Sequence, residues 1–181
     1  MIKFLQYTTV IILILIISKP ALSQDQAKIK WYSIEEAAKL TKKKKKKIFV
    51  DLYTDWCGWC KKMDSNTFTD PVIVEYMNEN FYPVKLDAET SDTITINGQQ
   101  FINPKPGTRR SSHQLAIALL NGKMSYPSFA FLDDEVKLIT VLPGYNPPEK
   151  LEPVLHYIAE GAYKKESYQD FFSSFKGSFG E

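Results

Sequence analysis

The feature that most constrains this chain is the stretch Trp56-Cys57-Gly58-Trp59-Cys60, which holds both of its cysteines, three positions apart. A continuous apolar run, Ile48 to Tyr53, precedes the stretch with one acid inside it, and helix-compatible residues follow. A buried strand that leads into a helix places the two thiols one helical turn apart. Thiols at this spacing either close a disulfide across the turn or lie side by side when reduced. The pair is therefore the candidate redox centre.

The N-terminal residues have the pattern of a secretory signal peptide. Lys3 supplies a short positive region, residues 10–17 are continuously apolar, and Ala21-Leu22-Ser23 fits a cleavage site. The apolar run is shorter than the roughly 20 residues that a membrane-spanning helix needs. We expect residues 1–23 to be a signal peptide and the mature protein to be exported, periplasmic or otherwise extracytoplasmic, without a membrane span. An uncleaved membrane anchor is the alternative.

The charge and length of the rest of the chain exclude some classes of function. Removing residues 1–23 takes away two of the 23 basic residues and none of the 21 acidic ones, so the formal net charge becomes zero. This balance gives no support for nucleic-acid binding. A chain of this length buries roughly 70% of its unfolded surface as one domain and needs no disulfide to hold its core. A single close cysteine pair in an exported protein therefore favours catalysis over a structural role.

A run of six lysines, Lys42 to Lys47, lies between the first expected helix and the first expected strand. Cations at the end of a helix are favoured by the negative end of its dipole. We interpret the run as a solvated helix end, and a surface for an anionic partner is the alternative.

Strands and helices alternate along residues 24–162, which we expect to form one α/β domain with a mixed central sheet and helices on both faces. Expected strands cover residues 48–53, 81–87, 129–132 and 136–142, and expected helices begin near Ser33, Cys57, Asp70, Ser111 or Ser112, and Pro147. Asn97-Gly98 predicts a hairpin, because both positions of such a turn need positive φ. This hairpin and the helix after it form an insertion, about residues 88–123, before the third strand. Residues 163–181 are an expected amphipathic extension.

The positions of the two cysteines predict different roles, since a thiolate rather than a thiol attacks a disulfide. Cys57 at a helix start lies beside unpaired backbone N–H groups that favour its anion. Cys60, one turn further, is placed to attack a mixed disulfide formed at Cys57. Asp51 lies inside the apolar strand, where burial would raise the pKa of its carboxyl and suit it to accept a proton from Cys60. Lys85 is its expected partner, and the alternative is an acid at an exposed strand end.

Other uses of the cysteine pair have weaker support in the sequence. A structural zinc site needs four ligands, and beyond the pair the chain offers only His113 and His156, which we expect to be surface or packing residues. Haem attachment needs a histidine directly after the second cysteine, where this chain has Lys61. We expect no metal, and no cofactor beyond a redox-active Cys57–Cys60 disulfide. A fixed structural disulfide and a copper-binding or carrier role stay open.

These motifs, in this order, resemble the thioredoxin family. The matching pieces are Ile48-Phe-Val-Asp51, Trp56-Cys57-Gly58-Trp59-Cys60-Lys61, Lys85, Tyr126-Pro127-Ser128-Phe129 and Gly144. The resemblance covers about residues 31–160 and is greatest to exported bacterial thioredoxin-like proteins. It implies a thioredoxin fold, with Cys57 as the nucleophile, Cys60 as the resolving thiol and Asp51 as the buried acid–base group. It also implies a cis peptide bond before Pro127.

Three departures from the family pattern bear on the reduction potential of the pair (Trp59), on partner choice (Tyr126) and on the surroundings of the site (the insertion). Trp59 replaces the usual proline, Tyr126 is bulkier than the usual residue before the cis proline, and the insertion is additional. The expected substrate-binding residues are Trp56, Gly58, Trp59, Tyr126 and Pro127. The insertion either forms a flap beside the cysteine pair or extends the edge of the sheet.

The expected function is a protein-disulfide reductase that acts outside the cytoplasm by dithiol–disulfide exchange at Cys57 and Cys60. The expected partners are exported proteins with cysteines or disulfides and an electron donor on the membrane side, with no nucleic acid. The protein is expected to act as a monomer. A buried acid beneath the pair resembles reducing members of the family more than strong oxidants. The alternatives are a disulfide oxidase or isomerase, and a non-catalytic module that binds a metal or an apoprotein.

Overall fold

The computed structural model describes residues 27–108 and 110–179, and the predicted signal peptide lies outside them. The helices are α2 (Ile34–Lys43), α3 (Gly58–Ser65), η1 (Thr67–Thr69), α4 (Pro71–Asn80), α5 (Gln114–Leu119), α6 (Pro148–Ala159), η2 (Ala162–Lys164) and α7 (Tyr168–Ser174), of which η1 and η2 are short 3₁₀ turns. The strands are β1 (Lys47–Tyr53), β2 (Phe81–Asp87), β3 (Ile94–Ile96), β4 (Gln99–Phe101), β5 (Ser128–Leu132) and β6 (Leu138–Pro143). In the described part of the chain, no helix is long and apolar enough to cross a membrane.

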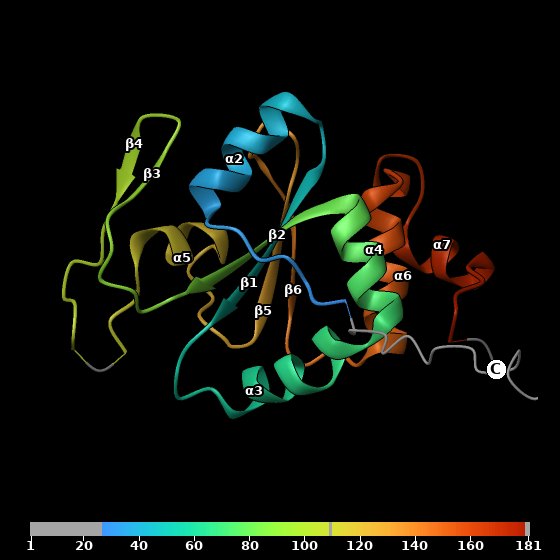
Figure 1. Ribbon diagram of the computed structural model, residues 1–181, viewed down its shortest axis with the longest axis horizontal. Helices are drawn as coiled ribbons and strands as arrows, with labels where there is room; N and C mark the ends of the chain where they lie inside the picture. Colours follow the sequence, from blue (N-terminus) through green and yellow to red (C-terminus); the bar gives the residue numbers. More distant parts are fainter. Residues whose placement is uncertain (1–26, 109, 180–181) are drawn as a thin grey trace, which may run out of the picture.

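Four strands form the central sheet in the order β2-β1-β5-β6 (Figure 1). β1 pairs parallel with β2 and antiparallel with β5, and β5 pairs antiparallel with β6. The predicted mixed sheet is therefore confirmed. Since β1 is a central strand, Asp51 has Lys85 of β2 on one side and Phe129 of β5 on the other. The C-terminal end of β1 leads directly to Cys57.

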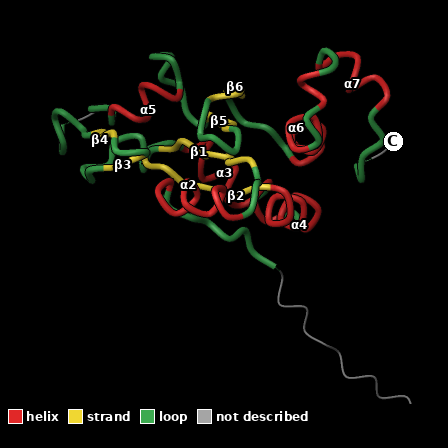
Figure 2. The backbone as a smooth tube through the Cα atoms, turned by 90° about the horizontal axis from the view of Figure 1, so that it is seen from above, coloured by secondary structure: helices red, strands yellow, loops and turns green. Residues whose placement is uncertain are grey.

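Helices cover both faces of this sheet, as Figure 2 shows in a view at right angles to Figure 1. Ile48, Val50 and Leu52 of β1 belong to a buried cluster with residues of α2 and α5. Phe49 belongs to a second buried cluster with residues of α3, α4 and α6, and stacks on Phe129 with ring centroids 5.4 Å apart. Burial on both faces explains why β1 is continuously apolar instead of alternating.

Local capping and turn patterns form as the sequence predicts. Ser33 and Glu36 make a reciprocal capping box at the start of α2. The Asp70 side chain accepts two backbone N–H groups at the start of α4. Asn97 and Gly98, with φ of 50° and 84°, make the turn between β3 and β4. These elements depend on neighbouring residues alone, and tertiary packing leaves them intact.

The start of α5 differs from the prediction. The sequence offered Ser111 or Ser112 as the cap, but His113 occupies the cap position and its Nδ1 accepts the N–H of Leu115. The backbone N–H of His113 donates to the Ala88 carbonyl at 2.8 Å, and the residue is fully buried. A contact across the fold therefore sets the helix start, in place of the local serine pattern.

The fourth strand of the central sheet begins later than predicted. Val136 lies in the β5–β6 turn with φ of 66°, and its N–H donates to the Asp133 carbonyl. The Asp133 side chain also accepts the N–H groups of Glu135 and Lys137, which closes the turn. β6 thus starts at Leu138, and the prediction that it starts at Val136 is wrong. Val136 is β-branched, a residue type that favours strands, but the turn that Asp133 closes takes it out of the strand.

The C-terminal extension packs against α6. Tyr157 of α6 contacts Tyr168 and Phe171 of α7, each with ring centroids 5.3 Å apart. The buried Glu152 carboxylate of α6 accepts the backbone N–H of Ser178 at 2.8 Å. Aromatic contacts and one buried acceptor therefore hold the extension to the domain.

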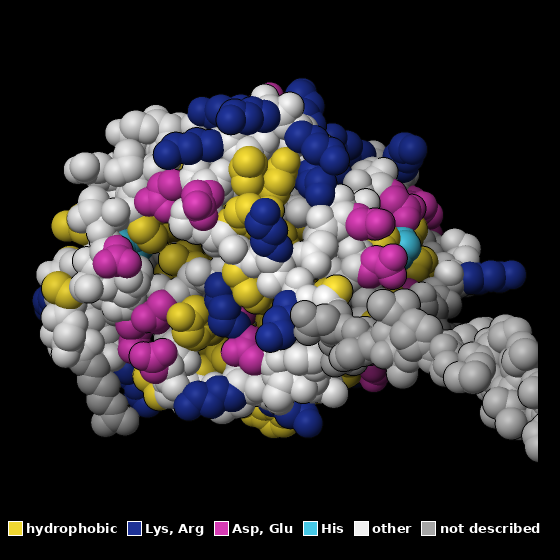
Figure 3. Space-filling view, viewed as in Figure 1, with side chains coloured by type: hydrophobic (Ala, Val, Ile, Leu, Met, Phe, Trp, Pro, Cys, Tyr) yellow, Lys and Arg dark blue, Asp and Glu magenta, His cyan; other side chains and the backbone are white. Residues whose placement is uncertain are grey.

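The lysine run makes contacts that its sequence did not indicate. It begins in the last turn of α2, and Lys and Arg side chains gather over that region in Figure 3. Lys46 donates to the Asn78 carbonyl in the last turn of α4, and Lys47 donates to the Ala159 carbonyl at the end of α6, each at 2.9 Å. The run thus supplies cations to the ends of three helices, where carbonyls lack helical partners.

Candidate redox site

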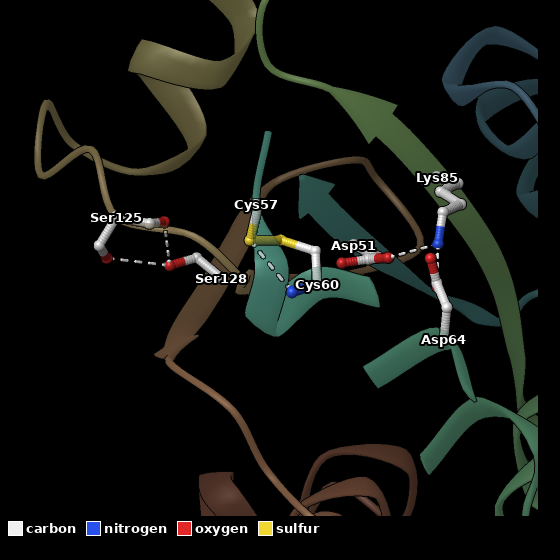
Figure 4. The surroundings of a disulfide bond; sticks show 7 residues. All are labelled: Asp51, Cys57, Cys60, Asp64, Lys85, Ser125 and Ser128. Atoms are coloured by element: carbon white, nitrogen blue, oxygen red, sulfur yellow. Dashed lines mark hydrogen bonds and ion pairs between the residues drawn. A yellow bond between two sulfur atoms is a disulfide. The ribbon is translucent and has the colours of Figure 1, made fainter. Parts of the chain in front are cut away.

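The two cysteines form a disulfide at the start of α3 (Figure 4). Cys57 is the cap residue, and its Sγ accepts the backbone N–H of Cys60 at 3.1 Å. Their Cα atoms lie 5.3 Å apart, and the residues are only 4% and 3% exposed. The Cys57 sulfur therefore lies at the positive end of a helix and receives one of its unpaired N–H groups, an environment that favours a thiolate when the disulfide is reduced.

Asp51 lies on β1, and Figure 4 shows its carboxylate on the same side as Cys60; it is 1% exposed, so the alternative of an exposed acid is wrong. One carboxylate oxygen, Oδ2, lies 3.1 Å from the Lys85 ammonium. The other, Oδ1, is buried and has no hydrogen-bond partner among the described residues. Burial raises the pKa of Asp51 to about 6, and the neighbouring Lys85 only partly opposes this rise. Such a carboxyl can take up or release a proton near neutral pH.

Lys85 is shared between two carboxylates, because its ammonium also pairs with Asp64 of α3 (Figure 4). Aromatic rings lie 5.1, 5.1 and 5.7 Å from that ammonium, in Trp31, Tyr53 and Phe68 respectively. Burial acts to lower the pKa of Lys85, but the two carboxylates raise it above its usual value. Asp64 was missed from the sequence; its position four residues after Cys60, one turn further along the same helix, was the available signal.

Three predicted substrate-binding residues lie at the surface around the disulfide. Gly58 is the exposed first residue of α3. Trp56 and Trp59 are 55% and 62% exposed, which is unusual for indoles. Trp56 meets Tyr126 edge to face at 5.9 Å, and Trp59 lies 5.4 Å from the ring of Tyr145. Each cysteine is therefore preceded in the chain by an exposed aromatic ring that contacts a tyrosine from a distant segment.

The structure also brings Tyr126 and Pro127 to this end of the sheet. Ser128 begins β5 and pairs with Leu52, near the end of β1. The Tyr126–Pro127 peptide bond is cis, and the Pro127 carbonyl accepts the N–H of Gly144 at 2.8 Å. The predicted residues Cys57, Cys60, Asp51, Lys85, Trp56, Gly58, Trp59, Tyr126 and Pro127 thus lie at one end of the domain.

The insertion lies beside the site and does not extend the main sheet. β3 and β4 form a separate two-stranded sheet next to α5 (Figures 1 and 2). Two residues of the insertion contact Trp56: its indole N–H donates to Glu89 Oε2 at 3.1 Å, and the Arg110 guanidinium lies 6.0 Å from its ring. Neither residue was a sequence candidate, because nothing local links Glu89 to a tryptophan 33 positions earlier.

The described residues include no group of three or more His, Cys, Asp or Glu side chains that could hold a metal ion. His113 is a fully buried cap residue, and His156 pairs with Glu160 at 2.7 Å on the surface of α6. Both histidines therefore have the packing or surface roles that were expected of them.

The fold and this site together define a class of protein: oxidoreductases of thioredoxin fold with a Cys-x-x-Cys disulfide. Residues 34–159 match the model of a thioredoxin-like domain family, and the chain belongs to that family. It is similar to a thiol:disulfide interchange protein, DsbD, of Haemophilus ducreyi, with 46% identity over 39 residues. That match covers 22% of this chain and only 7% of DsbD, so the chain spans a small part of this relative.

Solved structures agree on the fold. A structure described as a DsbH oxidoreductase has a TM-score of 0.52 and 20% identity, and the match covers 77% of this chain and 88% of that one. A thioredoxin from Thermus thermophilus has a TM-score of 0.56 and 19% identity, covering 76% and 93%. At these identities the likeness carries the fold alone.

Proposed function

We propose that the protein reduces disulfides of exported proteins by dithiol–disulfide exchange at Cys57 and Cys60. The observation that carries the proposal is the Cys57–Cys60 disulfide at a helix N-terminus, drawn in Figure 4 together with a buried Asp51 whose pKa is raised to about 6. Buried and perturbed carboxyls cluster at sites of chemistry. A disulfide that only braced the fold would gain nothing from an acid that is costly to bury.

The reaction begins from the reduced pair. The Cys57 thiolate attacks one sulfur of the substrate disulfide, so that a mixed disulfide forms and the other substrate sulfur leaves as a thiolate. Cys60 then gives its proton to ionised Asp51 and attacks the Cys57 sulfur. The second substrate sulfur leaves, and the Cys57–Cys60 disulfide forms. Two electrons pass from the pair to the substrate, which gains two thiols when its thiolates take up protons.

The structure supports a proton-accepting role for Asp51 at neutral pH. With a pKa of about 6, most of the carboxyl is ionised at pH 7 and can accept a proton. Below pH 6 it is protonated and can no longer do so. Lys85 lies next to the Asp51 carboxyl, and its positive charge offsets part of the cost of burying the ionised carboxylate.

The proposed partners follow from the proposed location. An exported reductase needs an electron donor on the membrane side to return its disulfide to the dithiol, and its substrates are exported proteins with cysteines. No nucleic acid, metal or added cofactor takes part, and the protein acts as a monomer. The leader pattern in residues 1–23 supports export.

The experiment that tests the proposal is reduction of insulin disulfides with dithiothreitol as the electron donor. Wild-type protein should accelerate the reaction, and Cys57→Ser should abolish the acceleration because no thiolate is left to attack. Equal rates with wild type and variant would contradict the enzyme proposal. The direction of electron flow is tested by trapping thiols in the native compartment: a pair found mostly reduced supports a reductase, and a pair found fully oxidised supports the oxidase alternative.

A further inference from the structure

Trp56 is fixed by residues from the insertion as well as by the site itself. Its indole N–H donates to Glu89, its ring meets Tyr126 edge to face, and the Arg110 guanidinium lies 6.0 Å from its ring centroid. The side chain is nevertheless 55% exposed and precedes Cys57 directly. An exposed indole that is held on several sides presents a rigid apolar surface beside the reacting sulfur.

A single buried amide links the two parts of the insertion that contact Trp56. Asn103 is 5% exposed and donates from Nδ2 to the carbonyls of Glu89 and Ser111, at 3.1 and 3.0 Å. Its Oδ1 accepts the Ser111 hydroxyl and the backbone N–H of Lys105. All four hydrogen-bonding positions of this amide are thus used. The amide ties the backbone of Glu89 to the residue that follows Arg110.

The buried His113 holds the same segment from a second direction. Its backbone N–H donates to the Ala88 carbonyl, and its ring Nε2 lies 3.1 Å from the Asp92 carbonyl. Its Nδ1 accepts a backbone N–H, so Nε2 carries the ring hydrogen and donates it. The later half of the insertion therefore fixes the backbone carbonyls of Ala88, Glu89 and Asp92. The backbone is held at Glu89 itself and at positions before and after it in the sequence.

We propose that the insertion is a recognition device: Glu89 and Asn103 are positioning residues that hold Trp56 as a wall for polypeptide substrates beside Cys57. The proposal rests on the proposed exchange function and adds what the insertion contributes to it. A protein substrate is long enough to lie against Trp56 while its disulfide reaches Cys57. A small disulfide reacts at Cys57 without covering the indole. The insertion should therefore affect binding of protein substrates and leave the chemistry unchanged.

The test compares two substrates, insulin and hydroxyethyl disulfide, with KM and kcat measured separately for each. Glu89→Ala removes the acceptor for the indole N–H, whereas Glu89→Gln keeps an acceptor and removes only the charge. Asn103→Ala removes the link between the two segments. Glu79→Ala, a carboxylate removed at the lysine-lined end of the domain, is the matched control. Thermal unfolding of each variant identifies any loss of the fold.

Glu89→Ala and Asn103→Ala should raise KM for insulin roughly three- to tenfold, the effect of freeing one ordered aromatic side chain, with kcat unchanged. Their rates with hydroxyethyl disulfide should stay within about twofold of wild type, since that substrate is too small to contact Trp56 while it reacts at Cys57. Glu89→Gln should restore the wild-type KM. If Asn103→Ala fails to fold, the surface variant Glu89→Ala carries the test alone.

Two results would overturn the inference, and they are distinct from failure of the proposed function. One is an unchanged KM for insulin in Glu89→Ala. The other is an equal loss with both substrates, which would indicate a general structural effect. If wild-type protein reduced neither substrate, the exchange function itself would be refuted, and this inference with it.

Discussion

The two ends of β1 use charge in opposite ways. At its start, Lys46 and Lys47 donate to carbonyls that end α4 and α6, and Lys45 pairs with Asp134 at 3.1 Å. Burial lowers the pKa of both Lys46 and Lys47, although each ammonium still has an oxygen acceptor. These side chains line a cleft of about 410 Å³ at the lysine-rich end. Charge at this end neutralises the negative ends of helices.

At the disulfide end, polar groups are buried without complete partners. In the described part of the chain, the buried side-chain atoms that lack a hydrogen bond are Asp51 Oδ1, Thr54 Oγ1 and the Tyr126 hydroxyl. All three belong to the segments that surround the cysteine pair. Such groups cost the fold about 1–3 kcal/mol each. At the lysine-rich end each partly buried ammonium has an oxygen acceptor, whereas the disulfide end leaves buried polar atoms without partners among the described residues, at the place where we propose a reaction.

The largest expected effect comes from removing the charge at the disulfide end. Asp51→Asn should raise the free energy of unfolding of the oxidised protein at pH 7 by about 1–3 kcal/mol, because the buried carboxylate has its pKa raised from 3.8 to about 6. An acid whose pKa is higher in the folded state binds its proton more tightly there. The contribution of Asp51 to wild-type stability therefore falls as pH rises from 3.8 towards 6, and stays lower above that range.

Urea unfolding at pH 4 and pH 7 checks this prediction. The difference between Asp51→Asn and wild type should be small at pH 4, where Asp51 is largely protonated in the folded protein, and large at pH 7. An equal difference at both pH values would show that the carboxylate charge is not its cause.

A smaller effect of opposite sign is expected at the lysine-rich end. Lys47→Met keeps an unbranched side chain but removes the donor to the Ala159 carbonyl. Loss of this hydrogen bond from a charged group outweighs relief of the burial that lowers the pKa of Lys47, so the free energy of unfolding should fall by about 1 kcal/mol. Insulin reduction should be unaffected, since this residue lies at the far end of β1 from the cysteines. Lys39→Met, at an exposed position inside α2 and outside its last turn, is the control and should change little. A loss of insulin reduction in Lys47→Met would contradict the claim that the lysine-rich end acts independently of the disulfide end.

The smallest expected effect concerns Asp64. Asp64→Asn removes a negative charge near Asp51 and leaves Lys85 to pair with Asp51 alone, and both changes lower the pKa of Asp51. A pH titration of the Asp51 carboxyl carbon by NMR should show that the pKa of Asp51 falls by about half a pH unit in this variant. This is the size of effect expected from a neighbouring charge that is partly exposed. Glu75→Gln, which removes an exposed carboxylate from α4, is the control. A pKa that stays fixed or rises in Asp64→Asn would refute the sharing of Lys85.

Much of the fold could be predicted because its signals are local. The apolar run of β1, the capping box at Ser33, the Asp70 cap and the Asn97-Gly98 turn each need only a few neighbouring residues. Cys57 and Cys60 form a pair because a helix places them one turn apart. The errors arose where a tertiary contact competes with a local pattern. His113 caps α5 because its backbone also bonds the Ala88 carbonyl, and no serine pattern indicates that contact.

The parts of the site that sequence could not supply are those held across long separations. Asp64 and Lys85 meet only because α3 lies against the face of β1 that carries Asp51. Glu89 reaches Trp56 because Asn103 and His113, both far along the chain, fix its backbone. Likewise, the role of the lysine run depends on where α4 and α6 happen to end. Residue type and spacing indicate the chemistry of the pair, but its surroundings depend on packing.

The central claim is that Asp51 accepts the proton of Cys60 during exchange. The most direct measurement is the pH dependence of insulin reduction by wild-type protein and Asp51→Asn. The wild-type rate should rise through a step near pH 6, the pKa of Asp51, and the variant should lack that step. At pH 7 the variant should be slower by about tenfold or more, as expected for loss of general base catalysis. The claim is contradicted if both proteins show the same pH profile and the same rate.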